Sequence, residues 1–152
     1  MEKELKVAAL RNGTVIDHIP AGQVFKVVEI LHLHHYENQI TIGNNLDSKK
    51  MGSKGIIKIS DRYIDEAEAN KIALVAPEAK INIIRNYEVV EKRYVNLPQE
   101  IIEIVHCPNP KCITNNDPVR THFHVRKQAN GQILLHCHYC EKDLKCENAK
   151  IN

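Results

Sequence analysis

This chain of 152 residues lacks long apolar runs and a marked excess of charge of either sign, and we expect no signal peptide. A membrane-spanning helix needs about 20 apolar residues, whereas runs such as Ile72–Ala76 are far shorter. Lys and Arg total 21 against 19 Asp and Glu. We therefore expect a cytoplasmic protein that contacts no membrane.

Cysteine is scarce and unevenly placed. None occurs in the first 96 residues, and four of the five cysteines form two close pairs, Cys107 with Cys112 and Cys137 with Cys140. Thiols stay reduced in the cytosol, so cysteines paired at short spacing more often hold a metal ion than form disulfides. The pattern predicts a metal site in the last third of the chain.

The spacing of the two pairs is typical of a closed zinc site, in which four ligands surround the ion at about 2.3 Å. Pro108 and Pro110 would stiffen the first loop. Between the pairs, residues 121–127 and 132–137 predict a hairpin around the turn at 129–131, which brings the pairs together. We predict one structural Zn²⁺ ion with no coordination position open for catalysis, and buried cysteines without an ion are the alternative.

Other residues near the pairs compete for these roles. His106, His136 and His138 adjoin cysteines, but neighbours in an alternating strand point to opposite faces, so we leave them out of the ligand set. Cys146 is interpreted as a bystander. A redox role for Cys137 and Cys140 would require a strand before the pair and a helix after it, and the flanking sequence predicts neither.

Charge disfavours a nucleic-acid partner for this region. Residues 97–152 contain seven Lys or Arg and six Asp or Glu. A zinc ion bound by four thiolates lowers the net charge of the region by two, to about −1. Only Phe123 and Tyr139 are available for stacking on bases. Contact with another protein is therefore the favoured use of this surface.

The first 96 residues predict a separate α+β domain. The expected elements are a strand at Leu5–Arg11, a helix from Pro20 to Leu31, strands at Asn38–Leu46 and Lys54–Ser60 joined by a surface loop at Asp47–Gly55, a helix from Asp65 to Pro77, and a hairpin at Lys80–Val95. Asp65 and Glu68 have the spacing of a capping box. The order βαββαβ plus an extra strand is the ferredoxin-like plan, with two helices on one face of an antiparallel sheet.

The composition changes at Leu97–Glu100, which predicts domains at 1–96 and 97–152. For the second domain we expect a small all-β fold of the zinc-ribbon or rubredoxin-like kind, because its strands are short and its ligands lie in two loops.

Polar residues of the first domain indicate a binding site. We interpret Asn12–Pro20 as a loop that carries Asp17, for which a helix-cap or turn role is the alternative. Lys54 and Lys58 share one face of a strand and could equally form a solvated edge, and Lys92 ends the last strand. Together these groups suit ribose hydroxyls and phosphates, although the chain has no Gly-rich phosphate loop.

Four stretches of the chain resemble the regulatory chain of aspartate carbamoyltransferase: GTVIDHIP, ITIGNNLDSKKMGSKGIIKI, APEAKINIIRNYEVVEK and CPNPKCITN with CHYCEK. The resemblance covers almost the whole sequence. It implies a non-catalytic subunit of the pyrimidine-pathway enzyme that binds CTP, UTP and ATP and dimerises through its first domain. It also implies docking of the zinc domain on a catalytic chain, in an assembly of two catalytic trimers with three regulatory dimers.

The resemblance implies residue roles by motif position. The positions that match a nucleotide site are Val7, Ala9, Leu10, Asp17, His18, Lys54, Lys58, Asn82, Ile84, Tyr87, Val89 and Lys92. Those that match zinc ligands are Cys107, Cys112, Cys137 and Cys140. Those that match partner contacts are Asn109, Lys111, Ile113, Tyr139, Glu141 and Lys142. The chain departs from better-known members at Glu4, where they have a lysine, and at Lys111 and His138.

Two other functions fit parts of the pattern. The chain could instead be a zinc-ribbon adaptor or a nucleic-acid-binding protein, in which the zinc domain binds the partner and the ferredoxin-like domain accompanies it. An enzyme is the least favoured function. Asp17 and His18 could form an acid/base pair, but no nucleophile lies beside them in the sequence.

Overall fold

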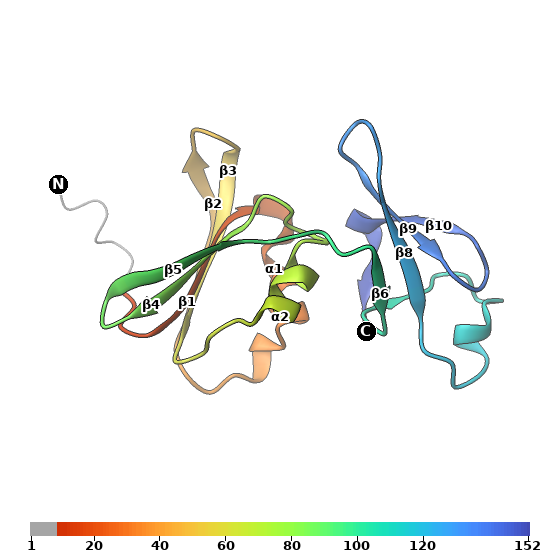
Figure 1. The fold of residues 1–152 in the computed structure, drawn as a ribbon, viewed down its shortest axis with the longest axis horizontal. Coiled ribbons are helices and arrows are strands. Elements are labelled where there is room, and N and C mark those ends of the chain that lie inside the picture. The colour runs from red at the N-terminus through yellow and green to blue at the C-terminus, as the bar shows by residue number, and fades with distance from the viewer. Residues whose placement is uncertain (1–8) are drawn as a thin grey trace. The chain divides into compact units, whose positions relative to one another are not determined.

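The structure is a computed structural model that describes residues 9–152 (Figure 1). The chain divides into two compact units, Met1–Asn96 and Leu97–Asn152. The first unit combines a five-stranded sheet with two α-helices, and the second consists of short strands and 3-10 turns. Within residues 9–152, no helix is both long enough and apolar enough to cross a membrane.

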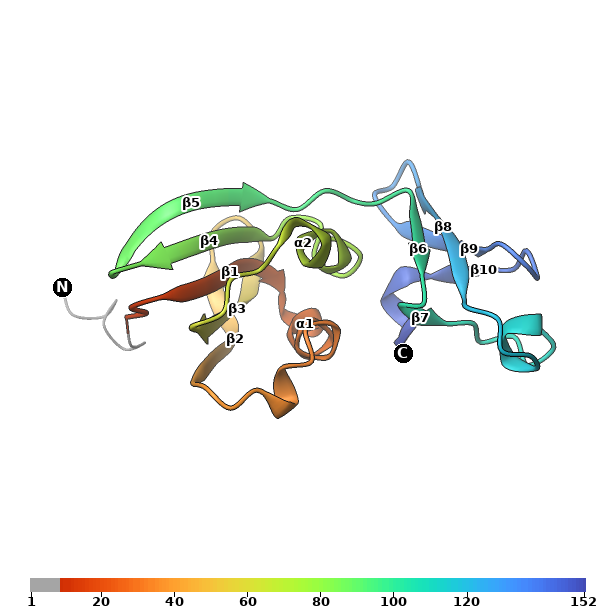
Figure 2. The same cartoon turned by 60° about the horizontal axis from the view of Figure 1, so that its bottom comes forward.

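The first unit has the predicted ferredoxin-like plan with an extra strand. Its strands are β1 (Gly13–Pro20), β2 (Ile40–Ser48), β3 (Gly52–Ser60), β4 (Lys80–Arg85) and β5 (Glu88–Tyr94), and its helices are α1 (Val24–Ile30) and α2 (Glu66–Ile72). The strand order is β2-β3-β1-β4-β5, and every neighbouring pair is antiparallel. Both helices lie on the same side of the sheet (Figures 1 and 2).

Alternation along the strands separates the two faces of this sheet. Ile57 and Ile59 of β3 are fully buried, while Lys58 between them is half-exposed. Ile16 of β1 and Ile81 of β4 are also fully buried. Successive side chains of a strand point to opposite faces. The isoleucines therefore pack against the helices and Lys58 projects from the open face.

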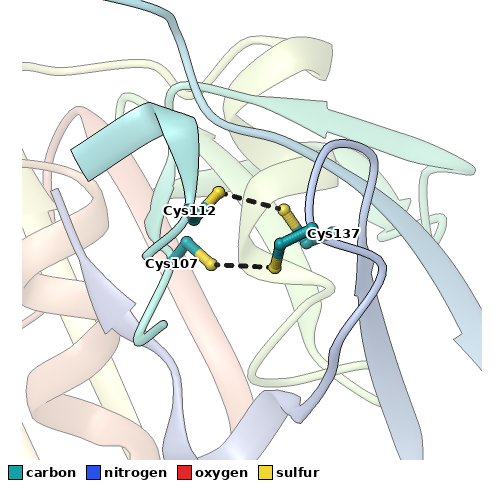
Figure 3. Close-up of side chains that lie close together, drawn as sticks. Cys107, Cys112 and Cys137 are labelled. Atoms are coloured by element: carbon teal, nitrogen blue, oxygen red, sulfur yellow. Dashed lines mark hydrogen bonds between the residues drawn. The ribbon is translucent and has the colours of Figure 1, made fainter. Parts of the chain in front are cut away.

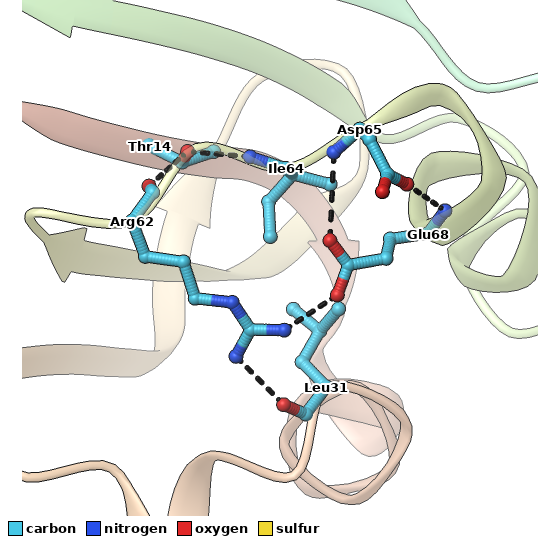
Figure 4. A network of polar contacts seen from close by, with 6 residues as sticks. All are labelled: Thr14, Leu31, Arg62, Ile64, Asp65 and Glu68. Atoms are coloured by element: carbon cyan, nitrogen blue, oxygen red, sulfur yellow. Dashed lines mark hydrogen bonds and ion pairs between the residues drawn. The ribbon is translucent and has the colours of Figure 1, made fainter.

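A buried hydroxyl ties β1 to the loop that follows β3. The Thr14 side chain is completely buried, and its Oγ1 donates to the Arg62 carbonyl at 2.7 Å while accepting from the Ile64 N–H at 3.2 Å (Figure 4). Arg62 in turn donates to the Leu31 carbonyl at 2.8 Å. Because buried polar groups are costly when unpaired, this network holds the loop and the end of α1 in one arrangement.

The predicted capping box at the start of α2 is present. The Glu68 N–H donates to Asp65 Oδ1 at 2.8 Å, and the Asp65 N–H donates to Glu68 Oε1 at 3.5 Å (Figure 4). Arg62 Nη2 also pairs with Glu68 Oε2 at 2.5 Å. The glutamate thus caps the helix and joins it to the Thr14 network.

The expected loop at Asn12–Pro20 is wrong, because this segment forms β1 at the centre of the sheet, between β3 and β4. Its polar residues lie at an irregularity. The pairing with β3 shifts register between Ile16 and Ile19, and His18 has a positive φ of 60°. A β-bulge locally breaks the alternation that identifies a strand, so the sequence of this strand is similar to that of a turn.

Four element boundaries also differ from the prediction. The helix expected from Asp65 to Pro77 is shorter, because α2 ends at Ile72. Pro20 ends β1 and precedes a 3-10 turn at Ala21–Gln23, so α1 begins only at Val24. The loop expected at Asp47–Gly55 is shorter, because β2 reaches Ser48 and β3 starts at Gly52. Of the strand expected at Leu5–Arg11, residues 9–11 are not in a strand, and the rest lies outside the described residues.

The second unit is an all-β fold as predicted. Its strands are β6 (Glu100–Ile102), β7 (Val105–His106), β8 (His122–Lys127), β9 (Ile133–Cys137), β10 (Asp143–Lys145) and β11 (Lys150–Ile151). They form a four-stranded sheet of order β10-β9-β8-β6 and a two-stranded sheet of β11 with β7. The predicted hairpin is β8–β9, and Phe123 and Leu135 on its inner face are buried.

Candidate functional site

Two short loops bring four cysteines of the second unit together. Cys107 follows β7, and Cys112 immediately precedes a 3-10 turn at Ile113–Asn115. Cys137 ends β9, and Cys140 lies in the turn before β10. The four Sγ atoms lie within 4.8 Å of one another, and the close-up shows the labelled Cys107, Cys112 and Cys137 converging from the two loops (Figure 3).

The sulfur spacing fits a tetrahedral ion. Cys107 Sγ lies 3.8 Å from Cys140 Sγ, and Cys112 Sγ lies 3.8 Å from Cys137 Sγ. Four ligands at about 2.3 Å from a central ion are separated by roughly 3.8 Å at tetrahedral angles. A disulfide requires about 2.05 Å, and all four cysteines are free. The donor set is therefore the kind that binds zinc.

The protonation of these thiols is uneven. Burial raises the pKa of Cys107 to about 12. Burial also opposes ionisation of Cys140, but hydrogen bonds from the Asn109 side chain and the Lys142 backbone outweigh it and lower its pKa to about 7. The Thr114 hydroxyl donates to Cys112 Sγ at 3.2 Å. A bound cation would compensate four clustered thiolates, which would otherwise repel one another.

Two asparagines that the sequence analysis did not single out hold the first loop. The Asn115 side chain donates to the carbonyls of Cys107 and Asn109 at 2.9 and 2.7 Å. The Asn116 side chain donates to the Cys112 carbonyl at 2.8 Å. Asparagine commonly bonds nearby backbone in turns, so the Asn-Asn pair after Cys112 is a signal that could have identified this role.

The competing residues lie outside the sulfur cluster. His136 Nδ1 contacts Asp143 Oδ1 at 2.8 Å. His138 packs against His122 with ring centroids 4.4 Å apart. Cys146 is buried but does not belong to the group of four cysteines.

The residues that we expect to contact a partner surround the two cysteine loops. Ile113 and Tyr139 are each 44% exposed. Lys111, Glu141 and Lys142 are exposed as well. Asn109 is half-buried, and its Oδ1 accepts from the Lys111 N–H at 3.1 Å. A cavity of about 280 Å³ opens beside them, lined by Cys107, Pro108, Asn109, Pro110, Phe123, Lys142, Asp143 and Leu144.

In the first unit, strand register aligns three of the expected nucleotide-binding residues. Lys58 pairs with Val15, Val15 with Asn82, and Asn82 with Lys92. Directly opposed residues of antiparallel strands share one face. Lys58, Asn82 and Lys92 therefore form a row across β3, β4 and β5 on the open face of the sheet, and we call this row the cationic row.

Asp17 and His18 lie beside this row at the bulge of β1. Asp17 is neither a helix cap nor a turn residue, since it lies within β1 and Gln23 precedes α1. Its carboxylate pairs with Lys54 Nζ at 2.9 Å and accepts from the His18 N–H at 2.7 Å. Within the described part of the chain, the buried His18 Nδ1 has no hydrogen-bond partner.

The other expected nucleotide residues fall into two groups. Ala9, Leu10 and Lys58 line a cavity of about 170 Å³, together with Arg11, Gln39, Thr41 and Ser60. Tyr87, at the β4–β5 turn, donates its N–H to the Arg11 carbonyl at 2.9 Å, which links this turn to the segment before β1. Ile84 is buried, whereas Tyr87 and Val89 are exposed. Val7 and Glu4 lie outside the described residues.

Comparison with known proteins identifies each unit. Residues 5–96 match the family described as "Aspartate carbamoyltransferase regulatory chain, allosteric domain". Residues 99–150 match "Aspartate carbamoyltransferase regulatory chain, metal binding domain". Both matches coincide with the two compact units of the structure.

Three curated relatives named aspartate carbamoyltransferase regulatory chain align along nearly their whole length. The protein of Bacteroides fragilis is 56% identical, over 99% of this chain and 97% of its own. That of Porphyromonas gingivalis is 55% identical, over 99% and 98%. That of Neisseria gonorrhoeae is 50% identical, over 92% and 91%. These matches favour a regulatory subunit over an adaptor or an enzyme, and the chain belongs to the family of aspartate carbamoyltransferase regulatory chains.

Proposed function

We propose that this regulatory chain binds CTP, UTP and ATP on the open face of its first unit and docks through its second unit on the catalytic chain of aspartate carbamoyltransferase. The observation that carries the proposal is the cationic row, which aligns Lys58, Asn82 and Lys92 on a face that the helices leave uncovered. The cysteine cluster belongs to the other unit, and we assign it to attachment rather than to nucleotide binding.

The parts of a nucleoside triphosphate suit different groups on this face. The ammonium groups of Lys58 and Lys92 bind the phosphates, because charge-assisted hydrogen bonds to phosphate are strong. The Asp17 carboxylate accepts from ribose hydroxyls, and His18 Nδ1 offers a further polar atom. All three effectors share ribose and triphosphate, so these residues set the affinity for each of them.

The base is read by the segment near Leu10 and Tyr87. The main-chain N–H and C=O groups of this segment are hydrogen-bond donors and acceptors at fixed positions. Such groups can distinguish the edge of a purine from that of a pyrimidine. The hydrogen bond between Tyr87 and Arg11 connects the two sides of this region. We infer that Ala9, Asn82, Ile84 and Val89 complete its walls, with Val7 as a further contact.

The Asp17–Lys54 ion pair gives the site two states, one with the two side chains paired and one with each bound to the nucleotide. Both side chains are about one-fifth exposed, and their charged atoms lie 2.9 Å apart. When a triphosphate binds, Lys54 gains a second anionic partner and Asp17 can turn to the ribose. An effector changes the catalytic chains only by binding two conformations unequally, with a coupling of typically about 1 to 3 kcal/mol.

The second unit provides attachment. A Zn²⁺ ion held by Cys107, Cys112, Cys137 and Cys140 would fix both loops and thereby position the exposed residues around them. Ile113 and Tyr139 supply apolar contact area. Lys111, Asn109, Glu141 and Lys142 supply the polar rim.

The assembly follows the plan expected for the family. In this plan the first unit forms the homodimer. Three such dimers join two catalytic trimers. The complex acts in pyrimidine biosynthesis in the cytoplasm and involves neither nucleic acid nor membrane.

Calorimetric titration of the chain with CTP and ATP tests the nucleotide site. Lys92→Ala removes one charged contact and should weaken both nucleotides by about 10- to 100-fold, since such a bond contributes roughly 1.5 to 3 kcal/mol. Lys71→Ala is the matched control, because Lys71 lies in the last turn of α2, away from the open face. Unchanged CTP affinity in Lys92→Ala would show that the phosphates bind elsewhere.

A second titration separates the ribose contact from the phosphate contacts. Asp17→Asn should weaken CTP more than it weakens inorganic tripolyphosphate, because only CTP carries ribose hydroxyls. Equal losses for both ligands would show that Asp17 acts only by positioning Lys54.

Attachment is tested by sedimentation of the complex with the catalytic chain. A thiol-reactive mercurial should release free catalytic trimers, since it displaces the ion from the four sulfurs. Persistence of the complex after complete loss of the ion would contradict a docking role for the metal domain.

A further inference from the structure

Three histidines gather on the outer face of the four-stranded sheet in the second unit. His122 and His124 lie on β8 on either side of Phe123, which is 1% exposed and faces the core. The two imidazoles therefore project from the opposite face. His138 follows the end of β9, and its N–H donates to the His122 carbonyl at 2.8 Å. We call these three residues the histidine cluster.

The ring nitrogens of the histidine cluster lie close together. His124 Nε2 is 3.0 Å from His138 Nδ1. The rings of His122 and His138 stack with centroids 4.4 Å apart. One ligand atom from each histidine can be chosen so that all three lie within 4.8 Å of one another. Three imidazoles from two separate segments thus converge on one small volume.

A carboxylate of a third segment completes the group. Glu100 of β6 places Oε1 2.7 Å from His122 Nε2 and 3.5 Å from His124 Nδ1. A hydrogen bond from His122 lowers the pKa of Glu100, which favours its ionised form. Imidazole and carboxylate are the ligands that borderline divalent ions accept in proteins. Neutral imidazoles carry no charge, so the Glu100 carboxylate is the group that would offset part of the charge of the ion.

The spacing is compatible with coordination after small side-chain movements. An ion bound at about 2.0 to 2.1 Å separates its tetrahedral ligands by roughly 3.3 Å. With His124 binding through Nε2, the contacts between ligand atoms are 3.0 Å to His138 Nδ1 and 2.7 Å from His122 Nε2 to Glu100 Oε1, so these atoms must move apart slightly to admit an ion. The His122 and His124 side chains are 21% and 35% exposed, so an ion can enter from solvent.

This group is distinct from the cysteine cluster. The register pairs Phe123 with Cys137 and His124 with His136, so the sulfur and the imidazoles occupy opposite faces of the β8–β9 hairpin. The cysteine site uses the ends of β7 and β9, whereas the histidine cluster uses β6, β8 and the residue after Cys137.

We propose that the histidine cluster and Glu100 form a second metal site, which takes a borderline divalent transition ion such as Zn²⁺, Ni²⁺ or Co²⁺. An ion there cross-links β6, β8 and the turn after β9 on the solvent side of the sheet. The site lies in the second unit, apart from the residues proposed to bind a nucleotide.

The test uses the full chain with zinc already at its cysteines, checked by elemental analysis, and Ni²⁺ as the probe. Calorimetry should show one Ni²⁺ bound per chain with the zinc content unchanged. His124→Ala should weaken Ni²⁺ by at least about 10- to 100-fold, the loss that even an outer partner of a metal site causes. His35→Ala is the matched control, because His35 lies beside His34 in the first unit with ring centroids 4.5 Å apart.

Two further measurements keep the result unambiguous. Bound Ni²⁺ should give an absorption spectrum without thiolate-to-metal charge-transfer bands, which excludes exchange at the cysteines. Glu100→Gln, an exposed and nearly isosteric change, should also weaken Ni²⁺ and covers the case in which His124→Ala fails to fold. The proposal is overturned if Ni²⁺ does not bind, if it binds with thiolate bands, or if the folded variants and His35→Ala bind it equally well.

Discussion

In the first unit, isoleucine and valine side chains fill the space between the sheet and two helices, whereas in the second unit the sulfurs of Cys107, Cys112 and Cys137 occupy the interior beside a few apolar residues such as Phe123 and Leu135. Small domains bury too little apolar surface to offset the conformational entropy lost on folding. The contrast indicates that the first unit is stabilised by its core and the second by its ligand cluster.

The same contrast fits the two binding surfaces that we propose. The first unit has a complete core under one face of its sheet, so the other face is free to carry polar and charged residues such as Lys58 and Lys92. The second unit arranges its exposed residues around the two loops that the cysteines join. In the proposed function, the first unit would respond to a nucleotide while the second unit would keep its contact surface rigid.

Removing the metal from the second unit should have the largest effect. Structural zinc contributes about 10 kcal/mol or more to the folding of small domains, so Cys112→Ser or a strong chelator should unfold residues 97–152. Amide resonances of the first unit should keep their positions in a two-dimensional NMR spectrum. Cys146→Ser, a buried cysteine outside the cluster, is the control and should retain the ion. Simultaneous loss of both sets of resonances would show that the units fold as one.

A cavity in the core of the first unit should have the next largest effect. Ile57→Ala removes fully buried methyl and methylene groups and should lower the free energy of unfolding of that unit by about 2 to 5 kcal/mol. Ile56→Ala is the matched control on the half-buried opposite face and should cost less. Denaturant titration measures both changes, and elemental analysis should find the metal content unchanged. Equal losses from the two variants would contradict the assignment of the core face.

Nucleotide should stabilise one unit only. At 100 times its dissociation constant, CTP should add about 2.7 kcal/mol to the stability of the first unit, because it binds the folded form alone. Hydrogen exchange resolves the two units. CTP should slow hydrogen exchange in β1, β3 and β4 and leave it unchanged in β8 and β9. Equal slowing in the two units would contradict a nucleotide site confined to the first unit.

The smallest predicted effect concerns the start of α2. Asp65→Ala deletes the cap that accepts from the Glu68 N–H and should cost about 1 kcal/mol. Thermal unfolding of the first unit reports the loss. Asp65→Asn keeps an accepting oxygen and should restore most of it, whereas no loss in Asp65→Ala would mean that the Arg62–Glu68 contact alone positions the helix.

Local signals in the sequence predicted much of this architecture. The Asp65 and Glu68 spacing indicated the start of α2, and the turn at residues 129–131 indicated the β8–β9 hairpin. The spacing within each cysteine pair predicted that the sulfurs of that pair point to one place, because a short loop can orient two sulfurs toward the same point. Each of these features depends on residues close together in the chain.

The central strand could not be found in the same way. Asp17 and His18 interrupt its apolar alternation, and Pro20 at its end is also a common residue at helix starts. Pairing with β3 on one side and β4 on the other stabilises this strand in spite of its composition. Tertiary context overrides local propensity most readily in a strand with two neighbours.

By itself, the sequence determined the α+β fold class, the capping box of α2, the β8–β9 hairpin and the convergence of the four cysteines. Only the tertiary structure decided that Lys58, Asn82 and Lys92 form one row, that Asp17 pairs with Lys54, and that three histidines meet at Glu100. The physical reason is that propensity and ligand spacing act between neighbours in the chain. Strand register instead joins residues tens of positions apart, and it is set by how all the apolar side chains pack at once.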